Sequence, residues 1–496
     1  MKYKILTVVL VLGMIAAAVG FQNIELEKNR YHQHKMAVEK DECTDHDDRT
    51  FCTHLPLIHI VTDEEMPNSF QMDANGNKVP NETFVGATVE YFDNEIKNNH
   101  LTDTATVKER AIVRTRGASS REFDKKGYLI KFKEEDLVLN KRVSLSGMTK
   151  DSEWALHGPF MDKTLIRNYM CYNLSGEIME YAPNVRFCEA FLNGEYIGVY
   201  LLTEKVEYNA DGRINIERSD ADMDETAYIV EVDREEKDYF GAINTFAEYS
   251  YIHKISEGSA GYTKIVYPGN GLTEEQKQFI VDDISRFEKV LYSFDYNDED
   301  YGYENFIDVD SFVDYFLINE FTLNYDAMTL SRYIYKDIGS KIKLCVWDFN
   351  SAFDNYEHPM NLPETFLLQD SRWYEYLMKD ESFVDQVVKR YWKLRESYFD
   401  EAYLLNYIDE TIAYLGPAIG RNYEKWGYSF ESEYNGVNYD YLEPIERNPR
   451  NYEEAVKQLK DCIRQRIVHM DTHIDRLYSL CHESLNKKYN YEKEGP

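Results

Sequence analysis

The sequence is short of basic residues. Its 496 residues include 56 lysines and arginines against 89 aspartates and glutamates, so its formal net charge at pH 7 is −33. A surface of this sign repels both the phosphate backbone of a nucleic acid and an anionic membrane surface. We therefore expect no nucleic-acid partner, whereas a cationic protein would be attracted. The charge is also compatible with a secreted protein that acidic groups simply keep soluble.

Paired cysteine motifs are absent. None of the seven cysteines lies in a CxxC pair, which argues against a zinc site. Cys43 and Cys52 are separated by eight residues of polar chain and either close a small disulfide loop or stay reduced. The other cysteines are expected to be small buried apolar residues, namely Cys171, Cys188, Cys345, Cys462 and Cys481.

The sequence has one long hydrophobic run, at its N-terminus. Residues 5–21 are apolar and, as a helix, would span about 26 Å at about 1.5 Å per residue. Lys2 and Lys4 precede this run and hold the N-terminus in the cytoplasm by the positive-inside rule. We interpret residues 1–22 as an export signal, which places the rest of the chain outside the membrane.

The residues around this signal are compatible with cleavage and with retention. Ala16 and Ala18 resemble the small residues of a cleavage site, but the apolar run is long for a signal peptide. Its length favours an uncleaved anchor. The protein is then attached to the membrane through its N-terminal segment only, or secreted if the segment is removed.

The sequence contains no internal repeat and no low-complexity tract. Residues 23–54 are charged and have little apolar periodicity, which is typical of a stalk. The folded part is expected to begin at Leu55. Runs of β-branched and aromatic residues then predict strands within residues 55–62, 84–92, 111–116 and 128–132.

A β-hairpin is predicted over residues 185–204. Its centre is Asn193-Gly194, the dipeptide that most readily adopts the positive φ angles of a type I′ turn. Apolar residues at helical spacing predict a helix just before it, within residues 163–179. Further along, the sequence predicts a helix at 309–323 and short strands at 331–336 and 343–347.

The last third of the chain has a helical pattern. Beyond Arg372, apolar residues recur every three to four positions, so residues 373–485 are predicted to form an α-helical lobe. Residues 486–496 are expected to be a frayed tail. The fold class is therefore α+β, with a β-rich N-terminal part and a C-terminal α-helical lobe.

Several distinctive motifs follow one another over about 240 residues. They are RGASS (116–120) with KKGYLIK (125–131), DKTLIRN (162–168), FLNGEYIGVY (191–200), NYDAMTLSRYIY (324–335) and VWDFNSAFD (346–354). In type and order these motifs resemble the CotH family, the atypical protein kinases similar to spore coat protein H. The resemblance extends over about residues 55–480.

The resemblance implies a divergent protein-kinase-like fold. Residues 55–372 would form its core, a β-rich N-lobe with the catalytic segment, and residues 373–485 its helical lobe. The family is expected to bind ATP with a divalent metal, Mg²⁺ or Mn²⁺, and to phosphorylate Ser or Thr of a protein substrate. A substrate with basic residues would suit the acidic chain.

The resemblance assigns two carboxylates to the chemistry. Asp348, after a predicted strand, stands where the family resembles the metal-binding Asp of the kinase DFG motif, and Asn350 stands where many members have a second acid. Asp326, 22 residues before Asp348, matches the catalytic Asp that would orient or deprotonate the substrate hydroxyl. The structural alternatives are a turn-capping acid and a residue that ends a helix. Ser331 replaces a metal-binding Asn of conventional kinases, so the second metal ligand stays open.

No GxGxxG loop is present, so nucleotide binding depends on other residues. Lys131 is predicted to neutralise the phosphates, as the strand lysine of a kinase does, with Lys125 and Lys126 as competing candidates. The full set predicted to contact the nucleotide is Arg116, Ser119, Lys131 and Glu204. Asp162, Arg167 and Asn168 are expected instead to be a structural ion pair and cap.

Two functions are compatible with the sequence. The first is a protein kinase that acts outside the membrane, where ATP is scarce. The second is a non-catalytic surface protein, in which the 41 tyrosines supply contact area for adhesion or for assembly of the cell envelope or coat. The presence of both Asp326 and Asp348 favours the enzyme.

Overall fold

The computed structural model describes residues 30–40, 51–217, 225–233, 241–249, 262–269, 271–358 and 366–482. The chain from His32 onward forms one compact unit. The predicted anchor (1–22), Cys43 and the predicted frayed tail (486–496) lie outside the described residues. Within those residues, no helix combines the length and the apolar character needed to cross a membrane.

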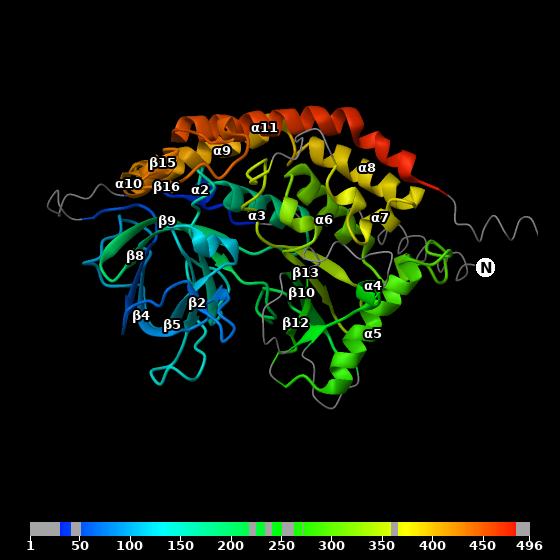
Figure 1. Ribbon diagram of the computed structural model, residues 1–496, viewed down its shortest axis with the longest axis horizontal. Helices are drawn as coiled ribbons and strands as arrows, with labels where there is room; N and C mark the ends of the chain where they lie inside the picture. Colours follow the sequence, from blue (N-terminus) through cyan, green and yellow to red (C-terminus); the bar gives the residue numbers. More distant parts are fainter. Residues whose placement is uncertain are drawn as a thin grey trace, which may run out of the picture. The chain divides into compact units, whose positions relative to one another are not determined.

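The first half of the compact unit is built around a β-barrel. Within the described residues, seven strands close it in the order β1-β4-β5-β6-β7-β9-β8, and β1 completes the ring by pairing in parallel with β8 (Figure 1). The strands are β1 (Leu57–Thr62), β4 (Val85–Phe92), β5 (Val107–Arg116), β6 (Gly127–Phe132), β7 (Glu153–His157), β8 (Val185–Leu192) and β9 (Glu195–Glu204).

The β8–β9 hairpin forms at the predicted place. Asn193 and Gly194 have φ angles of 51° and 80°, the left-handed values that a type I′ turn needs. In the sequence between β1 and β4, the strands β2 (Phe70–Met72) and β3 (Lys78–Pro80) form a small separate hairpin. The expected strands of the N-terminal part are thus present, and together they enclose a core of their own around Ile60, Val113 and Trp154.

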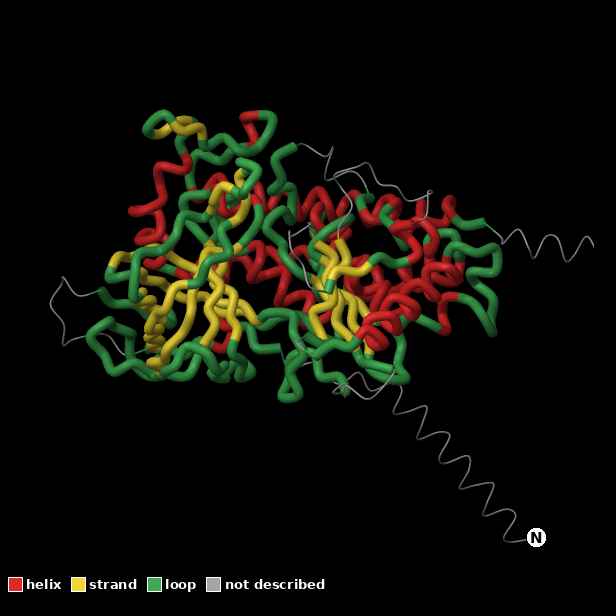
Figure 2. The backbone as a smooth tube through the Cα atoms, turned by 60° about the horizontal axis from the view of Figure 1, so that its bottom comes forward, coloured by secondary structure: helices red, strands yellow, loops and turns green. Residues whose placement is uncertain are grey.

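In the described part of the chain, a second sheet of five strands follows the barrel. Its order is β11-β12-β10-β13-β14, and Figure 2 shows it as a separate group of strands beside the barrel. The strands are β10 (Tyr228–Asp233), β11 (Ala242–Ile243), β12 (Tyr262–Tyr267), β13 (Arg332–Lys336) and β14 (Lys343–Val346). The end of β14 leads directly into the predicted acidic motif.

Helices pack on both sheets. They are α2 (Gln33–Met36), α3 (Arg167–Ile178), α4 (Phe246–Tyr249), α5 (Glu274–Leu291), α6 (Val309–Phe321), α7 (Tyr374–Leu377), α8 (Glu381–Arg395), α9 (Glu401–Leu415), α10 (Pro417–Trp426) and α11 (Tyr452–His473). Two short strands, β15 (Glu433–Tyr434) and β16 (Val437–Asn438), follow α10. The α+β class is therefore confirmed.

Helix α6 is the centre of the main core. It is buried almost all round, packs against β14, and contacts α3, α8 and α11 (Figure 1). Its C-terminus at Phe321 precedes the Asp326 segment. Since α8 and α11 follow residue 372 and α6 precedes it, one hydrophobic core extends across the predicted boundary between core and helical lobe.

The structure differs from the predicted stalk at residues 32–36. Helix α2 packs against α9, and His32 and Gln33 are buried. The Gln33 amide pairs with the backbone of Phe187 through bonds of 2.7 and 3.1 Å. His32 bonds to Glu177 at 2.7 Å. These polar residues have no apolar periodicity, so no local pattern predicted that they dock by hydrogen bonds.

Candidate active site

The acidic motif forms a tight turn after β14. Trp347 and Phe349 are buried, whereas Asp348 and Asn350 between and after them are half-buried. Asp348 has φ 57°, a left-handed conformation that is uncommon for a residue with a side chain. Its Oδ1 accepts the N–H of Asn350 at 3.0 Å. Among the described residues, no hydrogen bond to Oδ2 is formed, so this oxygen is available to a cation.

Side chains from helix α3 and from the segment after α6 fix this turn. Tyr172 Oη on α3 accepts the N–H of Asp348 at 2.9 Å, and Asn324 Nδ2 donates to the Asp348 carbonyl at 2.9 Å. Asn168, one helical turn before Tyr172, bonds to the next two residues of the turn. The left-handed conformation is thus held from both sides.

Asp326 lies in a 3₁₀ turn (Tyr325–Met328) that follows α6. Ser351 Oγ donates to Asp326 Oδ2 at 3.4 Å and to Asn324 Oδ1 at 3.3 Å. Because Asn324 also holds the Asp348 carbonyl, these bonds bring the two carboxylate segments together. Buried Arg332 supports the same turn by donating to the carbonyls of Ala327 and Met328, at 3.0 and 3.2 Å.

Arg116 places a positive charge beside the acidic turn. Its guanidinium lies 5.4 Å from the centroid of the Trp347 ring, the residue before Asp348. Both groups affect the pKa of nearby His157. Burial lowers this pKa to about 4, Asp348 acts in the opposite direction, and Arg116 lowers it further. Ser119 is exposed in the 3₁₀ turn (Ser119–Glu122) that follows Arg116.

Lys131 lies at the other end of the same barrel strands. It pairs with Ile112, four positions from Arg116 on β5, which is about 13 Å along the strand. Lys131 Nζ bonds to Glu153 Oε1 at 2.6 Å, and Glu153 Oε2 bonds to Lys205 at 2.9 Å. Burial works against the ionised form of Glu153, but Lys205 and Lys131 bring its pKa down to about 2. Lys131 and Lys205 therefore share the Glu153 carboxylate.

Glu204 is not part of this cluster, which differs from the prediction that it contacts the nucleotide site. It pairs with Trp154 on the inner face of the barrel, whereas Lys131 faces outward. Its Oε2 accepts the backbone and side-chain N–H groups of Asn184, both at 3.0 Å. The alternation of side chains along β9 therefore turns Glu204 away from Lys131.

The competing lysines have structural partners. Lys125 is buried and donates to the Val199 carbonyl at 2.6 Å and to Asn422 Oδ1 at 2.8 Å, so it links the barrel to α10. Burial holds the pKa of Lys125 well below its usual range. Lys126 donates to the Arg121 carbonyl at 2.9 Å.

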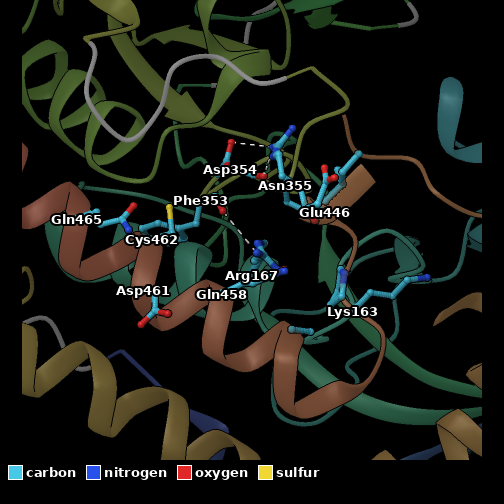
Figure 3. Close-up of a pocket in the computed structure, with 14 residues that line it drawn as sticks. Lys163, Arg167, Phe353, Asp354, Asn355, Glu446, Gln458, Asp461, Cys462 and Gln465 are labelled. Atoms are coloured by element: carbon cyan, nitrogen blue, oxygen red, sulfur yellow. Dashed lines mark hydrogen bonds and ion pairs between the residues drawn. The ribbon is translucent and has the colours of Figure 1, made fainter. Parts of the chain in front are cut away.

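Asp162 and Arg167, which were expected to be a structural ion pair, support the chain that follows the acidic turn. Buried Arg167 pairs with Asp162 at 2.7 Å and donates Nε–H to the Ala352 carbonyl at 2.9 Å. Arg167 lines a pocket of about 250 Å³, and Figure 3 gives a close-up of the residues around it. The pocket lies between the chain just after the acidic turn (353–355) and α11, and neither Asp326 nor Asp348 lines it.

The oxygen donors fit a hard divalent cation. Asp348 and Asn350 offer a carboxylate and an amide oxygen, and Mg²⁺ is commonly held by one or two such ligands together with phosphates and water. Within the described residues, no group of three or more His, Cys, Asp or Glu side chains is arranged for metal binding.

A family model described as CotH kinase protein matches residues 113–470, well over half of the chain. The chain belongs to the CotH family. Inner spore coat protein H of Bacillus subtilis (strain 168) is 22% identical over 313 residues, which covers 62% of this chain and 75% of that protein. The CotH match includes every candidate residue named above, from Arg116 to Asn350.

Several residues of the candidate site were missed by sequence reasoning. Asn324 and Ser351 carry no charge and lie in motifs that contain more conspicuous residues, and Tyr172 lies on α3 outside the motifs. Lys205, which shares Glu153 with Lys131, directly follows Glu204, the last residue of β9. A search for polar side chains one helical turn apart would have paired Asn168 with Tyr172 on α3.

Proposed function

We propose that this CotH-family protein transfers the γ-phosphate of ATP to a Ser or Thr of a protein substrate, with Mg²⁺ or Mn²⁺, on the outer side of the membrane. The observation that carries the proposal is the pair of carboxylate turns. Asp348 is held in a left-handed conformation, and Asp326 is joined to the same hydrogen-bond network through Ser351 and Asn324.

The two carboxylates have different proposed roles. Asp348 Oδ2 and Asn350 Oδ1 would hold the divalent cation. When bound there, the cation would neutralise phosphate charge during transfer. Asp326 would orient the substrate hydroxyl and accept its proton. Arg116, stacked on Trp347, would add positive charge next to the phosphates without a direct bond to Asp348.

The nucleotide contacts are proposals of the same kind. Lys131 faces outward from the barrel and pairs with Glu153, as a lysine that meets phosphate would be held by a carboxylate. Ser119 is exposed just beyond Arg116. With these assignments the barrel and the helical part would act as the N- and C-lobes of a divergent kinase-like fold.

The location and partner are proposed from the sequence and the comparison. The relative is named as an inner spore coat protein, and this likeness supports a place outside the cytoplasm, in a coat or at the cell surface. The predicted anchor at residues 1–22 would attach the chain to the membrane. The net charge of −33 favours a basic substrate and disfavours nucleic acid.

Incubation of the purified protein with labelled ATP and Mg²⁺ or Mn²⁺ tests this function. We expect autophosphorylation and transfer to basic peptides that contain Ser or Thr, and we expect chelation of the metal to abolish both. A folded protein that transfers no phosphate and binds no nucleotide with either metal would refute the proposal. The alternative, a non-catalytic surface protein for adhesion or coat assembly, would then be the better account.

A further inference from the structure

Asn168 directs its whole side chain toward the acidic turn and His157. It is the second residue of α3 and is only 6% exposed. Its Oδ1 accepts the N–H of Phe349 at 2.9 Å, and its Nδ2 donates to Asn350 Oδ1 at 2.7 Å. The same Nδ2 lies 3.1 Å from His157 Nε2. One amide thus connects three residues from two distant parts of the chain.

The orientation of this amide is fixed by its partners. The N–H of Phe349 can only donate, so it requires the oxygen of Asn168. Asn350 Oδ1 and an unprotonated His157 Nε2 can only accept, so both require the nitrogen. Rotation of the amide by 180° would place like groups against each other at the contacts with Phe349 and Asn350. Asn168 therefore links these residues through one defined orientation of its amide, and it is not a helix cap.

Asn168 and Tyr172 together form a template on α3. Their spacing of four residues places them on one helix face. Tyr172 holds the N–H of Asp348 and Asn168 holds the N–H of Phe349, so consecutive amides of the turn bind consecutive turns of one helix. A left-handed Asp348 is sparsely populated in a free peptide and persists only where its surroundings hold it. Helix α3 supplies this restraint.

We propose that Asn168 is a positioning residue of the CotH site, which turns Asp348 and Asn350 toward one common cation. Through Phe349 it fixes the backbone after Asp348, and through Asn350 it fixes the direction of the second oxygen ligand. One lone pair of Asn350 Oδ1 is used by Asn168, and the other is left for the cation. This inference has two halves. The restraint on the turn is independent of the proposed function, whereas the cation half, the orientation of Asp348 and Asn350 toward a cation, depends on it.

Hydrogen exchange of the full-length protein without ligand tests the restraint. Asn168→Ala should speed exchange of the Phe349 amide by about tenfold or more, because its acceptor is lost. Asn168→Asp keeps an acceptor at this position and should restore most of the protection. The matched control is Asn173→Ala, since buried Asn173 lies on the same helix and donates to Tyr407 Oη at 3.0 Å. The control should leave exchange over residues 346–352 unchanged.

The Mn²⁺ concentration at half-maximal phosphate transfer tests the cation half. Asn168→Ala should raise it by about 10- to 100-fold, the usual effect of removing a residue that orients a metal ligand. The rate at saturating Mn²⁺ should change less, and Asn173→Ala should not shift the requirement. Equal Phe349 protection in Asn168→Ala and the unmodified protein, or equal opening in Asn173→Ala, would overturn the inference. If the unmodified protein transfers no phosphate, the proposed function and the cation half fail together, and the exchange data still decide the restraint.

Discussion

The ion pair between Arg466 and Glu320 allows a stability prediction to be worked out from the structure. Both side chains are fully buried. Arg466 Nη2 donates to Glu320 Oε1 at 2.5 Å and to the Glu320 carbonyl at 2.9 Å. The carboxylate also accepts the backbone N–H groups of Leu367 and Leu368, each at 2.8 Å. The pair fastens α11 to the end of α6, four residues before Asn324.

Replacing Arg466 by methionine leaves the carboxylate buried without its cation. Breaking a buried pair in this way costs about 3–5 kcal/mol of the free energy of unfolding. Two backbone donors still reach Glu320, so we expect the lower end, about 3 kcal/mol. The control is Arg464→Met on the same helix. Arg464 pairs with Glu401 and Asp461 at the surface, and its loss should cost at most about 0.5 kcal/mol.

The cost of Arg466→Met should depend on pH. Burial raises the pKa of Glu320 above its ordinary value of 4.5, while Arg466 opposes the rise. Without Arg466 the folded-state pKa should rise further. A carboxyl group whose pKa is higher in the folded state binds a proton on folding, so stability falls as pH rises from 4.5 through the folded-state pKa. The loss should therefore be larger at pH 7.5 than at pH 5.

Urea denaturation followed by tryptophan fluorescence measures both effects. The midpoint of Arg466→Met should fall well below that of Arg464→Met at pH 7.5, and the two should approach each other at pH 5. If both variants lose equal stability at pH 7.5, or the Arg466→Met loss grows at pH 5, the reasoning about the buried carboxylate is wrong.

Three further predictions concern the site and the topology. Lys131→Ala should lose most of the thermal shift produced by ATP with Mg²⁺, whereas Lys125→Ala should lower the unliganded Tm but keep the shift; the reverse pattern would place the phosphates on the loop before β6. Tyr172→Phe removes the acceptor of the Asp348 N–H and should cost about 1–3 kcal/mol in urea denaturation, and an unchanged midpoint would contradict the role of this bond. The protein should sediment with membranes and be digested by protease added to intact cells, and full protection until lysis would refute the topology.

Local patterns predicted the elements that depend on local contacts. The Asn193-Gly194 turn formed because this dipeptide adopts positive φ angles with little strain, and α6 formed over residues 309–321 within the predicted 309–323. The segment with Asp348 was placed correctly at a strand end, since β14 ends at Val346. The α+β class followed from the change of period along the chain.

Long-range pairing could not be predicted in the same way. The parallel contact of β1 with β8 joins strands more than 120 residues apart, and neither strand differs from an ordinary buried strand in sequence. The inward direction of Glu204 depends on the register with Trp154 in β7, a strand that was not predicted. Similarly, the partners of Lys125 and Asn168 lie on elements that only the tertiary fold brings close. The identity of a polar residue shows what it can bind, but packing decides which partner it meets.

The central claim is tested most directly by comparing Asp348→Ala with Asp326→Ala in two assays, nucleotide binding and phosphate transfer. Asp348→Ala should lose metal-dependent binding of ATP as well as transfer, because a metal ligand stabilises both the bound state and the transition state. Asp326→Ala should bind ATP with Mg²⁺ as the unmodified protein does, yet transfer phosphate about 10²- to 10⁴-fold more slowly. Transfer at the unmodified rate by either variant would contradict the account.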